Sequence, residues 1–382
     1  MDGESFGDEI PNTTEIAIRV KPGTPLDECL HRFGGVHRVV DVLGEEVLFQ
    51  YSRDHEVLRV TVGASGRFPF PWAENWLAEP LRIMFGQLIY PRITARNHSD
   101  GSTHVSLRQN PEFLKTTAWI ALWPGGGDEM RFWALYADLL AHVVESHVAT
   151  GNETMDGAKL TKLYEEVVLA TRGSRWVWAM VIASSVENLL GDLMPADRTN
   201  PAVDHAAIEA MSGHVRAWNG DKGLIGTAIN ALERRRQLTA RNILATLKKS
   251  GVITRDEFDA WESLRHSSMH GNPVSRYGSH EADGEMLSLG SLLRKVTLEV
   301  IRPGRSPLVI DLTPPENTAR TKIIELAAKH DVKPFQYVLD RTALPLDETE
   351  ALLAALADAQ AITASEALRL HIEYIEQRYK SR

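Results

Sequence analysis

The sequence predicts an α+β protein in which a β-rich N-terminal domain is followed by a helical bundle and a small helical C-terminal appendage. Segments before about residue 130 are rich in β-branched and aromatic residues, which is typical of strands. From Arg131 onward, apolar residues recur at helical spacing instead. The length of 382 residues suits two or three domains of about 100–200 residues each. We therefore expect a β-rich domain over 1–130, a bundle over 131–303 and an appendage over 304–382.

The N-terminal strands are expected in pairs. The segments "VLFQY" and "VLRVTV" flank the turn-like "SRDHE", and "QLIYPRITARN" and "THVSLRQ" flank "HSDGS". A further strand is expected in "TAWIALWPGGG"; its glycine loop lacks the lysine and serine of a phosphate-binding loop and is interpreted as a turn. Four tryptophans are expected in the core rather than as base-stacking platforms, because aromatic residues mostly fill interiors: Trp72, Trp76, Trp119 and Trp123.

The helices of the bundle follow one another with short breaks. We expect them in "RFWALYADLLAHVVESH", "AKLTKLYEEVVLAT", "SRWVWAMVIASSVENLLGDL", "PAVDHAAIEAMSGHVRAW", one long helix "LIGTAINALERRRQLTARNILATLKKSG", and "GEMLSLGSLLRKVTLEVIRPG". The tail adds "DETEALLAALADAQA" and "SEALRLHIEYIEQRYK".

Composition and charge limit the class of function. The single cysteine, Cys29, rules out an internal disulfide framework and a cysteine-based zinc site. The most apolar run, 176–190, is too short to span a bilayer, and no signal peptide opens the chain, so we expect a cytoplasmic protein. The formal net charge of −9 disfavours a general nucleic-acid binder, since neutralising phosphates usually requires a basic surface. Any nucleic-acid function would need a local basic patch or a focused active site.

The stretch "WESLRHSSMHGNP", residues 261–273, indicates the end of a capped helix. Thr254 and Glu257 have the spacing of a capping box, and Ile253 and Phe258 occupy the staple positions around it. Phe258, Trp261 and Leu264 form an apolar edge expected to face the bundle. The glycine and proline at 271 and 273 then end the helix.

Arg265, His266 and His270 therefore occupy the last turns of this helix. The two histidines are four residues apart on nearly one face, and Arg265 lies about 140° from His270 on an ideal helix. The three side chains can converge on one anion, with a planar guanidinium fork for phosphate and a histidine that exchanges protons near neutral pH. Two other interpretations remain open: a solvated helix end whose cations stabilise the dipole, and a metal site, which lacks a third ligand and the glutamate of a HExxH helix.

The order of these residues resembles the HEPN family, whose members are helical bundles and include metal-independent ribonucleases of defence systems. The family motif is an arginine, a polar residue, a spacer and a histidine at a helix end, which here is Arg265-His266-Ser-Ser-Met-His270. An acidic residue on an earlier helix is also usual, and Glu187 in "SSVENLL" matches it. The resemblance covers roughly 155–303. In addition, "PLRIMFGQLIYPRITARN" is similar to the N-terminal region of ApeA-type anti-phage proteins.

The resemblance implies an all-α HEPN-like bundle and a metal-independent endoribonuclease of anti-phage, abortive-infection defence that needs no cofactor. RNA, with tRNA as one candidate, would be the substrate, and two copies would form a homodimer through the bundle. His270 would move protons, Arg265 would stabilise the transition state, His266 would support them, and Glu187 would hold Arg265 or His270 in place. The competing interpretation of Glu187 is a buried ion-pair partner with no catalytic role. The β-rich domain would act as a sensor or regulator. The alternative is a non-catalytic dimerisation or nucleotide-binding scaffold.

The densest basic run is "ERRRQLTAR", residues 233–241. Arg234, Arg235 and Arg241 are candidates for gripping RNA phosphates. A solvated helix face whose arginines pair with neighbouring acids is the competing interpretation.

Overall fold

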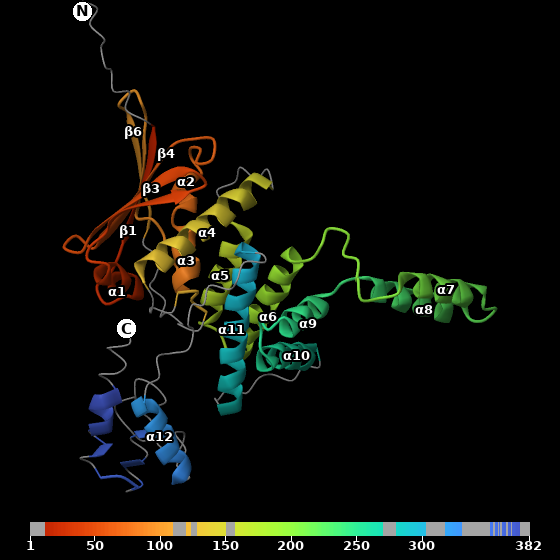
Figure 1. The fold of residues 1–382 in the computed structure, drawn as a ribbon. Helices are drawn as coiled ribbons and strands as arrows, with labels where there is room; N and C mark the ends of the chain where they lie inside the picture. The colour runs from red at the N-terminus through yellow and green to blue at the C-terminus, as the bar shows by residue number, and fades with distance from the viewer. Residues whose placement is uncertain are drawn as a thin grey trace, which may run out of the picture. The chain divides into compact units, whose positions relative to one another are not determined.

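An antiparallel sheet of six strands forms the N-terminal part of the chain (Figure 1). The computed structural model describes residues 12–109, 120–123, 128–149, 157–269, 280–302, 318–330 and parts of 352–374. The strand order is β2-β3-β4-β1-β5-β6. The strands are β1 (Thr13–Arg19), β2 (His37–Val42), β3 (Glu45–Ser52), β4 (Val57–Gly63), β5 (Ile93–Asn97) and β6 (Thr103–Leu107). With the helices that follow, they confirm the predicted α+β class.

The hairpins expected from the sequence are present. β3 pairs with β4, placing Phe49 opposite Val60, and β5 pairs with β6, placing Ala95 opposite Val105. Alternate residues of the central strands are buried, as a sheet covered on one face requires. β6 lies at the edge and is exposed at every position. The strand expected in "TAWIALWPGGG" is absent from its described residues, 120–123, which are buried without being in a strand; the rest of that segment lies outside the described residues.

Short helices join the sheet to the bundle. After α1 (Pro25–Arg32), the chain forms α2 (Ala73–Trp76) and α3 (Glu79–Phe85), next to β1 and α4 (Figure 1). Every residue of α3 is buried, although two of them are charged. α3 ends at Gly86, whose φ of +54° is a left-handed conformation that suits glycine. A side chain at this position would also meet Ile120.

The first long helix, α4 (Glu129–Ala149), packs directly on the sheet. The ring of Phe49 lies 4.5 Å from that of Trp133 and 4.8 Å from that of Tyr136, measured between centroids. Phe132 is fully buried and also contacts Phe33. The aromatic side chains of α4 and of the sheet thus pack in one shared core. Residues 1–124 and 128–307 accordingly form one compact unit.

The remaining helices of this unit are α5 (Lys159–Ala170), α6 (Arg175–Asp192), α7 (His205–Ala217), α8 (Lys222–Arg236), α9 (Ala240–Lys249), α10 (Arg255–Met269) and α11 (His280–Ile301). α6 lies at the centre and packs against α5, α9, α10 and α11. The predicted single long helix over 224–251 is wrong. It breaks between α8 and α9 at Gln237, which is extended, and Thr239, which caps α9 in a reciprocal pair with Asn242.

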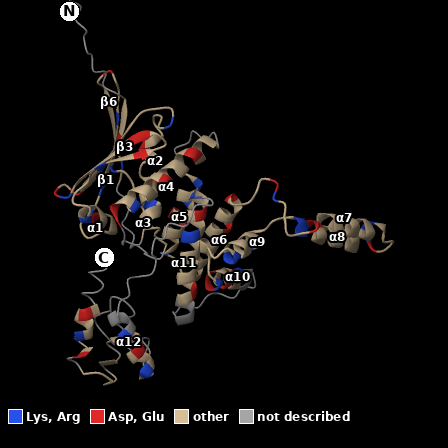
Figure 2. Ribbon diagram, in the orientation of Figure 1, with Lys and Arg blue, Asp and Glu red and all other residues tan. Residues whose placement is uncertain are grey.

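α7 and α8 pack on each other as a hairpin (Figure 1). The segments at the two ends of this hairpin are hydrogen-bonded to each other. The Leu238 N–H donates to the Arg198 carbonyl at 2.7 Å, and Thr199 forms an isolated antiparallel β-bridge with Gln237. No residue of α8 is buried, and in α7 only Ile208 and Ser212 are. Most of the pair is tan in Figure 2, the colour of uncharged residues.

A second compact unit comprises residues 125–127 and 308–382. Its described helix is α12 (Thr318–Lys329). Ile323 and Ala327 of α12 are buried in a small core with apolar residues between 352 and 374. Among the described helices of both units, none is long and apolar enough to cross a membrane.

Candidate functional site

α10 begins as its sequence predicts. The Thr254 N–H donates to the Glu257 carboxylate at 2.6 Å, and the Glu257 N–H donates to the Thr254 hydroxyl at 3.2 Å, which is a reciprocal capping box. Phe258, Trp261 and Leu264 are buried, as expected for the edge facing the bundle. The Trp261 indole N–H donates to the Ala183 carbonyl of α6 at 3.4 Å. These contacts fix the rotation of α10 against α6 and therefore decide which residues of its last turns face outward.

Arg265 and Glu187 meet on the outer surface between these two helices. An Nη of Arg265 lies 3.5 Å from a carboxylate oxygen of Glu187, and the two side chains are 45% and 48% exposed. The Arg265 guanidinium also lies 5.3 Å from the centroid of the Trp261 ring. The interpretation of Glu187 as a buried ion-pair partner is therefore wrong, while its predicted position beside Arg265 is found. A guanidinium held by a carboxylate and an aromatic ring, and still open to solvent, can receive an anion.

The two histidines of the motif are only partly placed. The backbone of His266 lies in α10, one residue after Arg265. Its side chain and the whole of His270 lie outside the described residues. Their convergence with Arg265 on one anion therefore stays a prediction from the sequence.

The basic run 233–241 does not form one continuous helix face, because the break between α8 and α9 divides it. Arg234 and Arg235 are exposed at the end of α8. Arg241 lies on α9 and pairs with Glu262 of α10, with 2.5 Å between Nε and the carboxylate oxygen. Arg236 pairs with Glu209 and Glu233. These ion pairs support the solvated-face interpretation for Arg236 and Arg241. Arg241 remains 62% exposed despite its pair, and Arg234 and Arg235 are exposed as well.

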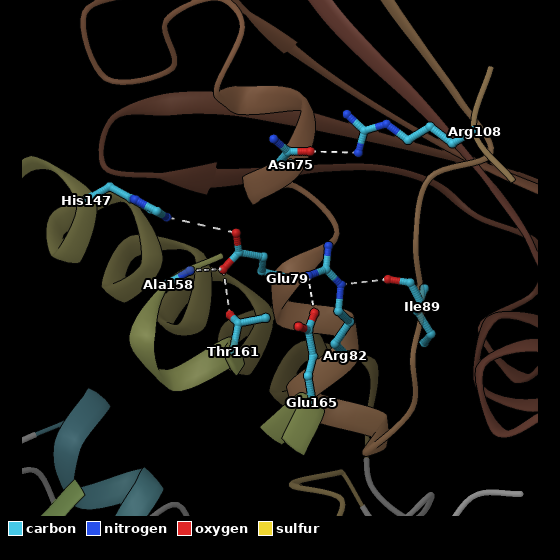
Figure 3. Close-up of polar contacts among 9 residues, drawn as sticks. All are labelled: Asn75, Glu79, Arg82, Ile89, Arg108, His147, Ala158, Thr161 and Glu165. Carbon is cyan, nitrogen blue, oxygen red and sulfur yellow. Dashed lines mark hydrogen bonds and ion pairs between the residues drawn. The ribbon is translucent and has the colours of Figure 1, made fainter. Parts of the chain in front are cut away.

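A second polar cluster, which the sequence did not predict, surrounds the buried Glu79 of α3 (Figure 3). One oxygen of Glu79 accepts hydrogen bonds from the Ala158 N–H at 2.9 Å and the Thr161 hydroxyl at 2.5 Å. The other oxygen lies 4.0 Å from Nε2 of His147. The ring of Trp76 stacks on His147 with 5.0 Å between centroids. One carboxylate thus joins α3 to the end of α4 and the start of α5.

Arg82 makes the neighbouring connection, one helical turn further along α3 (Figure 3). Its Nη1 donates to Glu165 of α5 at 2.7 Å, and its Nε donates to the Ile89 carbonyl at 2.8 Å. The guanidinium also lies 4.3 Å from the centroid of the Tyr90 ring. Burial, together with the nearby Glu165 carboxylate, raises the pKa of Tyr90 to about 12. Tyr90 therefore stays protonated throughout the physiological range.

The Glu79 and Arg82 cluster is suited to holding helices together, because its charged groups are enclosed. Glu79 is fully buried and Arg82 is 5% exposed. A sequence signal for such a cluster exists: a glutamate and an arginine three residues apart interrupt the apolar run "LAEPLRIMFG". Charged residues inside a buried helix need partners. The partners themselves are far away in sequence, which is why this signal does not identify them.

Two of the four tryptophans expected in the core are there: Trp76 and Trp123 are buried, at 4% and 3% exposure. Trp72 is half-buried, and Trp119 lies outside the described residues. The prediction of a core position is therefore confirmed for Trp76 and Trp123, but only in part for Trp72.

Comparisons with protein-family models, with curated proteins and with solved structures found no match for this chain. In the described part of the chain, no three His, Cys, Asp or Glu side chains gather in a way that could hold a metal ion. The case for a function therefore rests on the residues and their geometry. The exposed Arg265–Glu187 pair is the arrangement best suited to meet a ligand.

Proposed function

We propose that this protein is a metal-independent endoribonuclease of HEPN type that acts in anti-phage, abortive-infection defence. The observation that carries the proposal is the solvent-exposed Arg265, held 3.5 Å from Glu187 in the last turns of α10, five residues before His270. An arginine in this setting offers a fixed two-point contact to phosphate. The next histidine along the chain offers proton transfer near neutral pH.

The reaction needs no group beyond the RNA and these side chains. The 2′-hydroxyl of the substrate loses its proton and attacks the adjacent phosphorus, and the bond to the 5′-oxygen of the next nucleotide breaks. His270 takes or gives the proton as general base or acid. Arg265 stabilises the negative charge that develops on the phosphate oxygens. The products carry a 2′,3′-cyclic phosphate and a 5′-hydroxyl.

Glu187 acts in this proposal as a positioning residue. Its carboxylate holds the guanidinium of Arg265 without burying it, so the arginine is oriented before RNA arrives. Because one chain supplies one Arg265 and one His270, the proposal includes a homodimer in which two such helix ends form one cleft.

The test compares RNA cleavage by the wild type and by His270→Ala, Arg265→Ala and Arg265→Lys. Positioned proton transfer contributes about 10²–10⁴-fold, so His270→Ala should lose a factor of this size. Arg265→Ala should lose a comparable factor, and lysine should not fully restore it because it lacks the planar fork. Arg255→Ala is the matched control, since Arg255 lies on the same helix, is exposed and pairs with Asp259 instead. Its rate should equal that of the wild type.

Product ends, determined by mass spectrometry with and without EDTA, decide the chemistry. Cyclic phosphate ends that persist in EDTA, and inert DNA, agree with attack by the 2′-hydroxyl. Cleavage that requires a divalent metal, or full activity of His270→Ala, contradicts the proposal. RNA that stays intact with every variant, in cells and in vitro, favours the non-catalytic scaffold.

A further inference from the structure

The β5–β6 hairpin presents a row of basic and aromatic side chains on one face. Arg96 lies opposite His104 in the strand register, and the Arg108 N–H donates to the Arg92 carbonyl at 2.9 Å. Alternate residues of paired strands share a face. Arg92, Arg96, His98, His104 and Arg108 therefore lie together; we call this set the β5–β6 arginine face.

This face carries more positive charge than its carboxylate neutralises. Glu74 of α2 is buried and accepts from Arg96 at 3.1 and 3.3 Å and from Arg108 at 3.2 Å. The other terminal nitrogen of Arg108 donates to Asn75 at 2.7 Å (Figure 3). One carboxylate thus holds two guanidinium groups, and within the described part of the chain Arg96 and Arg108 have no second carboxylate partner.

The two arginines are also open to solvent. The side chains of Arg96 and Arg108 are 29% and 31% exposed. Arg92, which is exposed, donates to the Arg108 carbonyl and adds another cation, to which the described residues supply no carboxylate. Between Arg92 and Arg108 the sequence has three arginines and a single acidic residue, Asp100, although the whole chain has a net charge of −9. The hairpin is therefore a local basic patch on an acidic protein.

Aromatic rings border the arginines. The ring of His98 lies 5.1 Å from that of Phe70 and 5.3 Å from that of His104. His104 is exposed. Guanidinium groups that contact phosphate, beside rings on which a base can stack, are the two elements with which proteins hold a nucleotide unit.

We propose that the β5–β6 arginine face binds the phosphate groups of a nucleotide, either free or within an RNA strand. Arg92, Arg96 and Arg108 contact the phosphate, and the His98–His104 pair contacts the base. The position of the two arginines is fixed by Glu74 and Asn75, so little ordering is needed when the ligand arrives. This site belongs to the sheet and is distinct from the α10 helix end of the proposed nuclease. The proposal therefore assigns nucleotides as the class of ligand for the N-terminal region.

The experiment measures binding of two probes to the full-length protein: a fluorescein-labelled decamer of uridylate, by anisotropy, and ATP, by calorimetry. All proteins carry Arg265→Ala, so that the proposed nuclease site neither cuts nor holds the probes. His104→Glu adds a carboxylate opposite Arg96 without removing a partner of Glu74. Val105→Glu is the matched control, because it adds the same charge to the next residue of the same strand, on the opposite face, where Val105 is 60% exposed.

We expect His104→Glu to weaken binding at least about fivefold and Val105→Glu less than twofold, since a strand alternates its faces. For the decamer, three phosphate contacts predict an affinity loss of about twentyfold between 50 and 200 mM salt. Tighter binding of the decamer identifies a strand as the ligand, and tighter binding of ATP identifies a free nucleotide.

Equal effects of the two substitutions would show that only overall charge matters and would overturn the proposal. The proposal would also be overturned if neither probe showed saturable binding at low salt. Circular dichroism spectra of both variants confirm that the fold is intact. Because Arg265 is absent throughout, this result is independent of whether the chain cleaves RNA.

Discussion

Glu79 is the residue on which the junction between α3, α4 and α5 depends. Its side chain is fully buried and accepts from Ala158 and Thr161. Substitution Glu79→Ala would leave both donors unsatisfied, and an unsatisfied buried donor costs about 1–3 kcal/mol. We expect the free energy of unfolding in urea to fall by about 3 kcal/mol or more.

Two variants make this measurement specific. Glu79→Gln keeps one oxygen acceptor and should lose less than Glu79→Ala. Glu145→Ala removes an exposed glutamate of α4, two residues from His147, and should leave the urea midpoint nearly unchanged. If Glu79→Ala behaved like Glu145→Ala, the Glu79 cluster would contribute nothing to holding these helices together.

At the scale of elements, the start of α10 is tied to α11 by a second buried carboxylate. Glu257 lies 2.8 Å from the Lys295 ammonium and accepts from the Ser291 hydroxyl at 2.5 Å, in addition to its capping bond from Thr254. Burial alone would raise the pKa of Glu257, but the hydrogen bonds from Lys295, Ser291 and Thr254 outweigh it and hold the pKa below its usual value. Glu257 is therefore ionised in the folded protein at neutral pH.

This lowered pKa predicts how stability depends on pH. A carboxyl whose pKa is lower in the folded state stabilises the fold above its unfolded value, near 4.5. That stability is lost as the pH falls through the folded value. Wild type should therefore exceed Glu257→Gln in free energy of unfolding at pH 7, and the difference should shrink below about pH 4.5.

The matched variant is Asp259→Asn, which changes an exposed carboxylate of the same helix that pairs with Arg255. Its stability should follow the wild-type pH curve. Urea titrations at several pH values between neutral and acid test both variants. A difference between wild type and Glu257→Gln that stays constant down to the acid limit would contradict the lowered pKa.

Local elements were predictable where the signal lies within a few residues. The capping box of Thr254 and Glu257 and the apolar alternation of the β3–β4 hairpin are such signals, and both are confirmed. The break between α8 and α9 was missed although Thr239 and Asn242 carry a cap at the same spacing. Helical periodicity continues through Gln237, and periodicity alone does not detect a three-residue interruption between Arg236 and Ala240.

Contacts between distant segments could not be predicted in the same way. Glu79 and Thr161 are 82 residues apart, and nothing in either neighbourhood specifies the other. For the candidate nuclease site, the sequence suggested Glu187 as a partner of Arg265, which the structure places at 3.5 Å. It also allowed a buried Glu187, because the flanking residues of α6 are apolar. In the structure Glu187 is exposed because it lies on the solvent-facing side of α6, whereas most apolar residues of this helix face the interior.

At the scale of the whole molecule, the change in composition near residue 130 does not separate two cores. Phe132, Trp133 and Tyr136 follow this boundary and are buried, and Tyr136 donates to the Leu77 carbonyl at 2.8 Å. Burying a large apolar side chain contributes about 1.5–3 kcal/mol, so three of them contribute about 5–9 kcal/mol. That is as large as the net stability of many domains, about 5–15 kcal/mol.

We therefore expect a fragment of residues 131–382 to aggregate or to lack a cooperative transition, because it exposes the aromatic face of α4. A fragment of residues 1–307 keeps the sheet, α4 and the bundle, and should unfold in one cooperative step. Residues 308–382 have a small core of their own, including Ile323 and Leu356. Their removal should leave the melting temperature of the larger unit nearly unchanged.

Expression of the two fragments, followed by thermal melts and limited proteolysis, tests this division. A soluble 131–382 fragment with a sharp melt would show that α4 and the bundle fold without the sheet. In that case the aromatic contacts of Phe49 with Trp133 and Tyr136 would join two independent domains. A 1–307 fragment that fails to fold would instead show that the C-terminal unit is needed for the stability of the first, which its separate core does not predict.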